Sequence, residues 1–228
     1  MWSYGVAIPA FNAAETIGET LASVLAQSVP PAAIVVVDDG STDETAQIAH
    51  GFGPAVEVIR QANSGPGAAA SLAMASLRTD LIATVDADDL WLEDKMEKQI
   101  AAMQADRGID ALFCRQRQFR HGATDRTAGE ERDGLNRSSM LIHRRVFETV
   151  GRLIDPPGNR GDMVDWLARA REAGFRLEML PEVLVLRRII PGSLSHGRDI
   201  TKDRGYLLVA RRAMERRKAM QKASEEPQ

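Results

Sequence analysis

The first half of the chain alternates short apolar runs with stretches of helical periodicity. The apolar runs are continuous and occupy residues 6–8, 33–37, 56–59 and 81–85. Helices are predicted between and after them, over 16–27, from Thr42, through the Ala-rich stretch that ends at Leu77, and over 91–103. Continuous apolar strands that alternate with helices are typical of a largely parallel sheet with helices on both faces. The pattern therefore predicts an α/β fold.

The second half of the chain has a less regular pattern. Residues 115–137 are polar and rich in arginine, and they are expected to form an edge hairpin and a mobile loop. Periodicity then returns in an apolar run over 139–143, helices over 144–150 and 162–173, and a strand over 183–190. A basic helix over 198–222 and a polar tail follow. Because no clear domain boundary interrupts this pattern, we expect a single domain.

Length, charge and cysteine content narrow the class of protein. The chain has 228 residues, which is enough to bury a proper core in one domain. Its net charge of -3 argues against general nucleic-acid binding, and its single cysteine, Cys114, excludes an internal disulfide framework. No apolar run reaches the roughly 20 residues of a membrane-spanning helix, and the N-terminus lacks the features of a signal peptide. A cytoplasmic protein without a transmembrane segment is therefore expected.

Three polar clusters follow the predicted strands, at the point where each strand ends. They are Pro9–Asn12 after the first strand, Asp38–Ser41 after the second and Asp86–Asp89 after the fourth. In an open parallel sheet, ligands bind beyond the carboxyl ends of the strands. If these strands are neighbours, their acidic residues gather around one crevice.

Structural roles are also expected for some residues of these clusters. The candidates for helix caps are Asn12 with Glu15, Ser41 with Glu44, and Asp89. Asp38 and Asp39 are typical turn residues before Gly40. These residues therefore have a structural alternative to ligand binding.

Asp86 and Asp88 are harder to explain structurally. Residues i and i+2 of an extended strand end point to the same side, so these two carboxylates are expected to lie close together. Like charges that close repel each other unless a positive group lies between them. A hard divalent cation is the obvious neutralising group, and such a cation commonly keeps positions for substrate phosphates. The pair therefore predicts a metal ion that holds a phosphorylated ligand.

Several motifs occur in a recognisable order. IPAFNAAETIGETLASVLAQS is followed by VVVDDGSTDET, ANSGPGAAA and TVDADDLWLEDKM. In this order and at these distances, they resemble the donor-binding half of a family 2 glycosyltransferase with a GT-A fold. The similarity continues through SMLIHRRVFETVGRLID, GDMVDWLARAREAGF and LPEVLVLRRIIPGSLS, and it covers about residues 3–196.

The resemblance implies a GT-A, Rossmann-like single domain over residues 1–197. Residues 1–105 would form the half that binds the nucleotide sugar, and residues 106–197 the half that binds the acceptor and carries the catalytic base. Residues 198–228 would add the basic helix and the polar tail.

The resemblance also implies roles in donor binding. The backbone of three loop residues would line the nucleotide pocket: Pro9, Ala10 and Phe11. Asp39 would bind the base, Asp86 would reach the ribose beside the metal, and Asp88 would bind the metal itself, usually Mn²⁺ or Mg²⁺. Arg188 is suited either to neutralising phosphate charge or to a salt bridge at the strand end.

For catalysis, the resemblance implies a carboxylate at the start of the later helix that acts as the base of an inverting transfer. Asp162 occupies that position, Asp165 lies one helical turn further on as the second candidate, and Trp166 would form a wall of the acceptor pocket. Such a base takes the proton of the acceptor hydroxyl, while the metal stabilises the leaving nucleoside diphosphate. Asp162 is also suited to a helix start, where the helix dipole favours a carboxylate.

The chain departs from the family pattern at two positions. Ala70 stands where family members often have an arginine, and Ile190 stands where they often have a metal-binding histidine. His196 is the nearest imidazole, but it is more typical of a surface residue. These departures favour one alternative, a nucleotide-sugar-binding protein of the same fold with little or no catalytic activity.

The predicted function is metal-dependent transfer of a sugar from a nucleotide-sugar donor, expected to be a UDP-sugar, to a hydroxyl acceptor. A phosphatase of the haloacid-dehalogenase type also has Asp-x-Asp after an apolar strand, but there the motif normally lies near the start of the chain. The sequence does not identify the acceptor, because residues 115–137 and the loop before Asp162 carry no recognisable pattern.

The C-terminal segment predicts an amphipathic helix. Leu207, Ala210 and Met214 lie at helical spacing among many arginines. Basic amphipathic helices bind anionic lipid, but this apolar face is narrow and contains no Trp or Phe. We therefore expect the face to pack against the catalytic domain or against a second copy of the chain, which would make a homo-oligomer.

Overall fold

The computed structural model describes residues 2–191 and 200–225 of the chain. Its strands, in chain order, are β1 (Tyr4–Ala10), β2 (Ala33–Asp38), β3 (Val56–Arg60), β4 (Leu81–Thr84), β5 (Leu90–Trp91), β6 (Ala111–Arg120), β7 (Glu131–Asp133), β8 (Leu141–His143) and β9 (Leu177–Ile189). Its α-helices are α1 (Ile17–Leu25), α2 (Thr45–His50), α3 (Pro66–Ser76), α4 (Lys95–Ala105), α5 (Arg144–Val150), α6 (Asp162–Glu172) and α7 (Ile200–Glu225). Two short 3-10 helices are η1 (Gly53–Ala55) and η2 (Arg137–Ser139).

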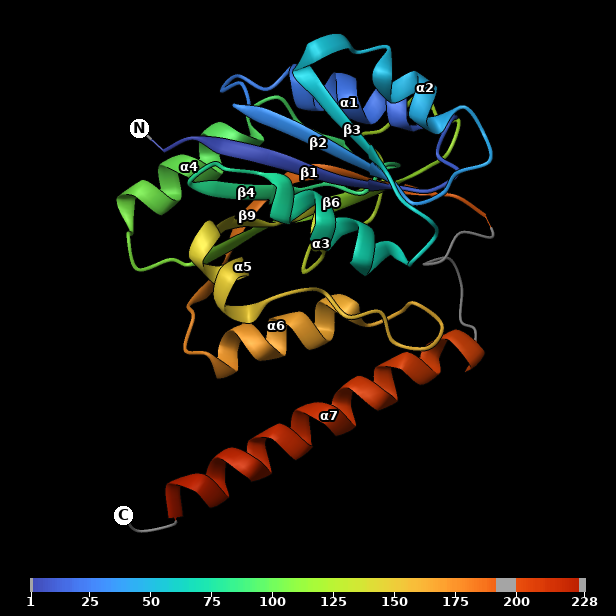
Figure 1. Cartoon of the computed structure of the whole chain (residues 1–228). Helices are drawn as coiled ribbons and strands as arrows, with labels where there is room; N and C mark the ends of the chain where they lie inside the picture. Colours follow the sequence, from blue (N-terminus) through green and yellow to red (C-terminus); the bar gives the residue numbers. More distant parts are fainter. Residues whose placement is uncertain (1, 192–199, 226–228) are drawn as a thin grey trace.

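A mixed, mostly parallel sheet forms the centre of the molecule (Figure 1). The strand order is β3-β2-β1-β4-β8-β6-β9-β5, and β7 pairs with β6 off this path. β1 is parallel to β2 and β4, and β2 is parallel to β3. β8 lies antiparallel between β4 and β6, while β6 and β9 are parallel to each other. The predicted α/β fold is confirmed.

Helices cover both faces of the sheet because the central strands are apolar on both faces. On one face, Val6 and Ile8 of β1 pack with Ile17 and Leu21 of α1, in a core that α2 and α4 complete. On the other face, Ala7 lies in a core with residues of α3, α5 and α6. Figure 1 shows α1 and α2 on one side of the sheet and α3, α5 and α6 on the other. Strands buried in this way require the continuous apolar runs that the sequence contains.

Two elements differ clearly from the sequence-based prediction, and one prediction of an irregular segment holds. The helix expected over 91–103 starts only at Lys95, because Leu90–Trp91 form β5 and pair with β9. β9 begins at Leu177 instead of residue 183, since its first residues pair in parallel with β6. The edge hairpin expected within 115–137 is formed by β6 and β7.

The two predicted capping boxes do not form. The residues before α1 and α2, Thr16 and Glu44, make no side-chain capping hydrogen bond, and the first amide of α2 donates to Asp43 Oδ1 at 3.0 Å. Asn12 and Ser41 instead join the loops that follow β1 and β2. The Asn12 amide donates to Ser41 Oγ at 2.9 Å, and the Thr42 amide donates to Asn12 Oδ1 at 2.9 Å. These side chains therefore fasten two loops together at the carboxyl edge of the sheet.

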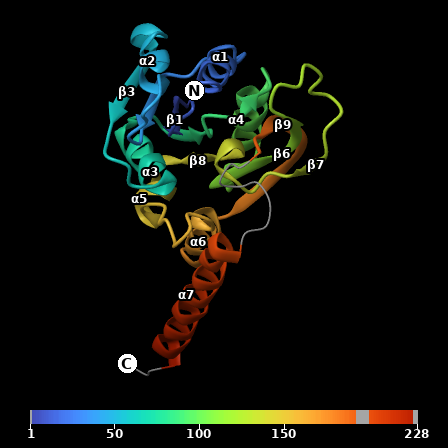
Figure 2. The same ribbon diagram turned by 90° about the vertical axis from the view of Figure 1, so that its right-hand side faces the viewer.

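The C-terminal helix α7 packs on the domain by a face other than the predicted one. It lies beneath α6 in Figure 1 and points away from the sheet in Figure 2. Val209 is buried, and Arg216 forms ion pairs with Asp165 and Glu172 of α6. The apolar stripe faces outward instead: Leu207 is 75% exposed, Met214 is 57% exposed, and Ala210 is exposed as well. Association with a second copy stays a prediction.

Two further expectations fall on or beside residues that the structure leaves undescribed. His196 and the predicted helix start at Arg198 both lie outside the described residues. Within residues 2–191 and 200–225, no helix combines the length and the apolar character that crossing a membrane requires.

Lys95 is fully buried at the start of α4, without a carboxylate beside its ammonium group. Its Nζ donates to Gln99 Oε1 at 2.7 Å and lies 3.9 Å from the centre of the Trp91 ring. Burial lowers the pKa of Lys95 to about 8, although the nearby Cys114 acts in the opposite direction. The unfolded chain, in which the pKa of this lysine is ordinary, therefore binds more protons than the native chain between about pH 8 and 10.5.

We expect the contribution of Lys95 to the unfolding free energy to rise with pH across this window, because the native chain no longer has to bury a charge once Lys95 loses its proton. The raised pKa of the buried Cys114 thiol acts in the opposite direction above about pH 9, so the effect of Lys95 is read from the difference between variants. The full rise attributable to Lys95 is about 3 kcal/mol. Urea denaturation at a series of pH values should show that Lys95→Met removes this rise. The exposed neighbour Lys98, changed to Met, should leave it in place. Parallel pH curves for the wild-type chain and Lys95→Met would contradict the assignment.

Candidate active site

The loop after β1 is hydrogen-bonded to the loop after β2, and only part of it is open to solvent. Pro9 and Ala10 are buried, whereas the side chain of Phe11 is 51% exposed. The Asp39 amide donates to the Ala10 carbonyl at 2.8 Å. Of the residues predicted to line the nucleotide pocket, Phe11 is thus the one that lies open.

Asp39 holds the glycine-rich turn before α3. Its buried carboxylate accepts hydrogen bonds from Gln61 Nε2 at 2.6 Å, from the Ser64 amide at 2.8 Å and from the Gly65 amide at 2.9 Å. These bonds connect the end of β2 to the start of α3. The structure therefore gives Asp39 a role in shaping the loop, and its contact with the base stays a prediction.

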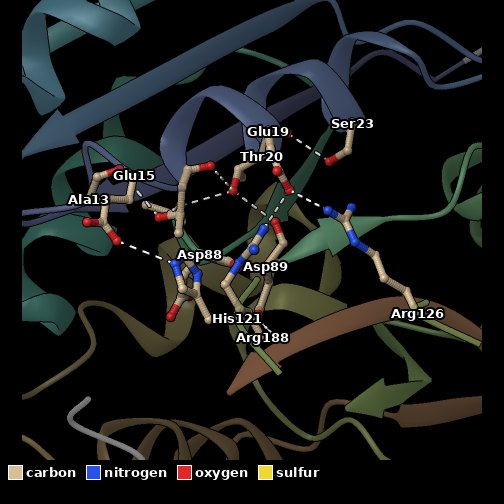
Figure 3. Close-up of polar contacts among 12 residues, drawn as sticks. Ala13, Glu15, Glu19, Thr20, Ser23, Asp88, Asp89, His121, Arg126 and Arg188 are labelled. Carbon is tan, nitrogen blue, oxygen red and sulfur yellow. Dashed lines mark hydrogen bonds and ion pairs between the residues drawn. The ribbon is translucent and has the colours of Figure 1, made fainter. Parts of the chain in front are cut away.

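The segment Asp86–Asp89 is a tight turn instead of an extended strand end. β4 ends at Thr84, and the Asp89 amide donates to the Asp86 carbonyl at 3.1 Å. Thr20 of α1 stabilises the turn, since its Oγ1 lies within hydrogen-bond distance of the carbonyls of Ala87 and Asp89 (Figure 3). The expectation that Asp86 and Asp88 project to one side of an extended strand is therefore wrong.

Arg188 fixes the same turn from the side of β9. Its Nε donates to the Asp88 carbonyl at 2.8 Å, and its Nη2 pairs with Glu19 at 2.8 Å. Arg126 reaches Glu19 as well, at 2.9 Å, and Figure 3 shows both arginines pointing toward this carboxylate. The Arg188 guanidinium also packs over the ring of Phe119. Of the two predicted roles, the structure has the salt bridge at the strand end, and the contact with phosphate stays a prediction.

Arg137 connects the two halves of the site, and the sequence analysis missed it. Its Nε pairs with Asp86 Oδ1 at 2.7 Å, and its Nη1 pairs with Asp162 Oδ2. The side chain of Arg137 is only 13% exposed, and that of Asp162 only 10%. The positive group that lies against Asp86 is therefore an arginine of the chain itself. Arg137 was hidden within the arginine-rich segment 115–137, where no pattern separates it from its neighbours.

A second residue that the sequence analysis missed is Asp155, in the loop before α6. Its carboxylate accepts the amides of Gly67 at 2.8 Å and Ala68 at 2.9 Å, in the first turn of α3. A Cβ atom on Gly65 would lie 2.7 Å from Asp155 Oδ2, and one on Gly67 would lie 2.8 Å from Oδ1. Gly65 also has a φ of +100°, which disfavours other residues. The glycines of the turn NSGPG thus make room for this carboxylate.

Asp88 is the carboxylate best placed for a metal ion. Among the described side chains it forms no ion pair. Burial, with the negative charge of Asp86, raises the pKa of Asp88 to about 6, so that a cation beside it would be stabilising. The described residues contain no group of three or more His, Cys, Asp or Glu side chains arranged to hold a metal. Asp88 therefore fits a cation that takes most of its ligands from a bound phosphate and water.

Asp165 and Trp166 are both buried. Asp165 forms ion pairs, and Trp166 packs in the hydrophobic core. Asp165 is 2% exposed, and its two carboxylate oxygens pair with Arg169 at 2.8 Å and with Arg216 at 3.0 Å. Trp166 is fully buried, and its Nε1 donates to the Gly151 carbonyl at 3.0 Å. The expectation that Trp166 lines an acceptor pocket is therefore wrong.

Two surface hollows, of about 410 and 360 Å³, lie elsewhere on the molecule. The first lies beside Glu19 and Arg126, and the second beside Trp2 and His143. Asp86, Asp88 and Asp162 line neither of them. These two hollows are therefore separate from these acidic residues.

An α/β domain with an acidic turn at the carboxyl edge of its parallel strands is the arrangement expected of a GT-A glycosyltransferase. The sequence model described as Glycosyl transferase family 2 matches residues 5–162. Since this match covers more than half of the chain, the chain belongs to glycosyl transferase family 2.

Similar proteins include two that are named for the biosynthesis of succinoglycan and of teichuronic acid. The succinoglycan biosynthesis protein ExoU of Rhizobium meliloti (strain 1021) is 36% identical over 202 aligned residues, in an alignment that covers 77% of this chain and 58% of that protein. A protein of Bacillus subtilis (strain 168) named as a teichuronic acid biosynthesis glycosyltransferase, TuaG, is 37% identical over 102 residues, 43% of this chain and 40% of that protein. The chain thus spans about half the length of these relatives.

Solved structures share the fold. S. aureus TarS 1-349 in complex with UDP-GlcNAc superposes with a TM-score of 0.70 at 21% identity, over 86% of this chain and 62% of that chain. The mannosyltransferase PcManGT from Pyrobaculum calidifontis, in complex with GDP-Man and Mn²⁺, gives a TM-score of 0.69 at 19% identity, over 85% and 59%. The GT-A fold predicted from the sequence is confirmed.

The contact between Asp155 and α3 predicts a measurable loss on mutation. Asp155→Ala should lower the unfolding free energy by about 2 kcal/mol, since it removes hydrogen bonds from two amides to a charged acceptor. Hydrogen exchange should quicken at the amides of Gly67 and Ala68. Asp125→Ala is a suitable control, because Asp125 is exposed and bonds only to Thr127 within its own loop; its effect should stay within about 0.5 kcal/mol. Equal effects of the two substitutions would argue against the contact.

Proposed function

We propose that this chain transfers a sugar from a UDP-sugar to a hydroxyl group of an acceptor, with inversion at the anomeric carbon. The observation that carries the proposal is the position of Arg137. One guanidinium touches both Asp86, from the predicted donor site, and Asp162, the predicted base. Donor and base residues, which are far apart in the sequence, therefore lie within the span of one side chain. Family membership and the nucleotide sugars bound to TarS and PcManGT support the donor class.

Asp162 is proposed as the general base. It takes the proton of the acceptor hydroxyl while that oxygen attacks the anomeric carbon from the face opposite the diphosphate. The bond between the anomeric carbon and the diphosphate oxygen breaks, and the nucleoside diphosphate leaves with the electron pair. Because the attack and the departure occur on opposite faces, the configuration inverts and no covalent nucleophile of the chain is needed.

Asp88, with Asp86 beside it, is proposed to hold Mn²⁺ or Mg²⁺ together with the diphosphate. When bound, such a cation stabilises the negative charge that develops on the leaving group. The surroundings favour a cation, since four carboxylates approach the site, from Asp86, Asp88, Asp155 and Asp162. Arg137 pairs with two of them, and the charges of Arg187 and Arg188 only partly offset the burial of Asp88. A diphosphate without a metal would meet a surplus of negative charge.

A second candidate function is binding of a nucleotide sugar with little or no transfer. It is favoured by the ion pair of Asp162, because Arg137 occupies the carboxylate that an acceptor hydroxyl would have to reach. The departures from the family pattern at Ala70 and Ile190 act in the same direction. Hydrolysis of the donor in the absence of any acceptor distinguishes the two functions.

Nucleoside diphosphate binding should depend on a metal. We expect UDP to raise the melting temperature of the chain when Mn²⁺ or Mg²⁺ is present and to have no effect with EDTA. At a UDP concentration of about 100 times Kd, the gain is about 2.7 kcal/mol, enough for a clear thermal shift. GDP in the same assay tests the choice of base. Equal shifts with and without EDTA would refute the metal assignment.

Asp162→Asn and Asp165→Asn should have different consequences. Asp162→Asn keeps the shape of the side chain and removes its basicity, so turnover of a UDP-sugar with Mn²⁺ should fall by about 10²–10⁴. UDP binding should be nearly unchanged. Asp165→Asn should mainly destabilise the fold, because it weakens two ion pairs of a buried carboxylate. If Asp165→Asn removes turnover and leaves stability intact, Asp165 is the base and the present assignment is wrong.

A further inference from the structure

The backbone around Arg137 is held by buried side chains of the sheet and α4. Three hydrogen bonds reach the carbonyls of η2: Thr84 Oγ1 to Arg137 at 2.6 Å, Trp91 Nε1 to Ser138 at 2.7 Å, and Gln99 Nε2 to Ser139 at 2.9 Å. Ser138 Oγ also donates to the buried carboxylate of Asp89. The base of the Arg137 side chain is therefore fixed by the protein core, independently of any ligand.

The guanidinium of Arg137 is held as a permanent cation among carboxylates. Burial lowers the pKa of Arg137, but the charges of Asp86 and Asp162 outweigh this effect and leave the pKa raised. Asp155 adds a third negative charge nearby. Arg137 thus neutralises part of an acidic cluster that a divalent cation would otherwise occupy.

The ion pairs limit what a free metal ion can find at this site. Of the carboxylates of Asp86, Asp88 and Asp162, the first and the last are paired with Arg137. Asp88 alone forms no ion pair among the described side chains. A single carboxylate gives Mn²⁺ or Mg²⁺ few ligands, whereas a diphosphate supplies several more oxygens. The diphosphate also offers the guanidinium a new anionic partner.

We propose that Arg137 is an internal counter-ion that makes metal binding depend on the nucleoside diphosphate. Without the diphosphate, Arg137 occupies Asp86 and Asp162, and the metal binds weakly. With the diphosphate, the phosphate oxygens complete the metal site, and metal and donor bind together. This inference rests on the proposed function, because it takes the diphosphate of the donor as the ligand of the site.

The test measures Mn²⁺ binding to the full chain at neutral pH, by the electron paramagnetic resonance signal of free Mn²⁺, with and without UDP. The wild-type chain should bind Mn²⁺ much more tightly with UDP than without it. Arg137→Gln removes the internal cation, so Mn²⁺ should bind without UDP at least about tenfold more tightly than to the wild-type chain. Arg137→Lys keeps the positive charge and should bind Mn²⁺ alone as weakly as the wild-type chain.

A matched control is Arg60→Gln. Arg60 also pairs with an aspartate at the carboxyl edge of the sheet, Asp38, at 2.9 Å, but it does not touch the acidic cluster. Arg60→Gln should leave Mn²⁺ binding unchanged. This result would show that tighter Mn²⁺ binding requires the loss of Arg137 in particular. Circular dichroism should establish that each variant is folded. If Arg137→Gln does not fold, Arg137→Lys and the comparison of the wild-type chain with and without UDP still decide the question.

Several results would overturn the inference. One is equal Mn²⁺ affinity of the wild-type chain with and without UDP. Another is an Arg137→Gln variant that binds Mn²⁺ alone no better than Arg60→Gln, and a third is tight binding by Arg137→Lys. Failure of the proposed function is separate: if neither UDP nor GDP binds the wild-type chain, the donor assignment fails, while the Mn²⁺ titrations without nucleotide still test Arg137.

Discussion

The parallel pairing of β1 with β2 and β4 is the constraint on which the site depends. In this register Ala10 lies beside Asp38 and Ala7 lies beside Thr84, so the three strands end at one edge. A shift by one residue would exchange the faces of β1 and bring Val6 and Ile8 out of their core. The apolar packing of the strands therefore fixes where the acidic loops meet, although none of the acidic residues contributes to that packing.

Several carboxylates meet at the carboxyl edge of the sheet, and the chain neutralises them in different ways. Backbone amides satisfy Asp39 and Asp155, and an arginine satisfies Asp86 and Asp162. Asp88 keeps a raised pKa because burial and the charge of Asp86 outweigh the nearby positive charges of Arg187 and Arg188. The partners of these carboxylates therefore differ. Those with amide or arginine partners hold the loops, and Asp88, which forms no ion pair among the described side chains, is the one suited to a cation.

The sequence was sufficient for the fold because continuous apolar runs have few structural solutions. The strands at 33–37 and 81–85 were placed almost to the residue, and the polar clusters after them do meet. Side-chain directions were less predictable. Asn12 has the spacing of a helix cap but bonds across to the next loop, and Trp166 lies in the core since α6 rotates it inward. Arg137 was not predictable, because its partners come from distant segments and an arginine-rich context hides a single buried guanidinium.

The contact of Asp155 with the turn before α3 has an evolutionary consequence. Gly65 and Gly67 leave no room for a Cβ atom while the carboxylate is in place, and the carboxylate has no other amide partners in the described structure. Asp155 lies about ninety residues beyond the two glycines, and its loss would remove the steric reason for Gly67, whereas the φ of +100° still favours glycine at position 65. Among related sequences, Gly67 and Asp155 should therefore be lost or retained together, and this coupled substitution pattern would connect the donor half of the fold with the loop before α6.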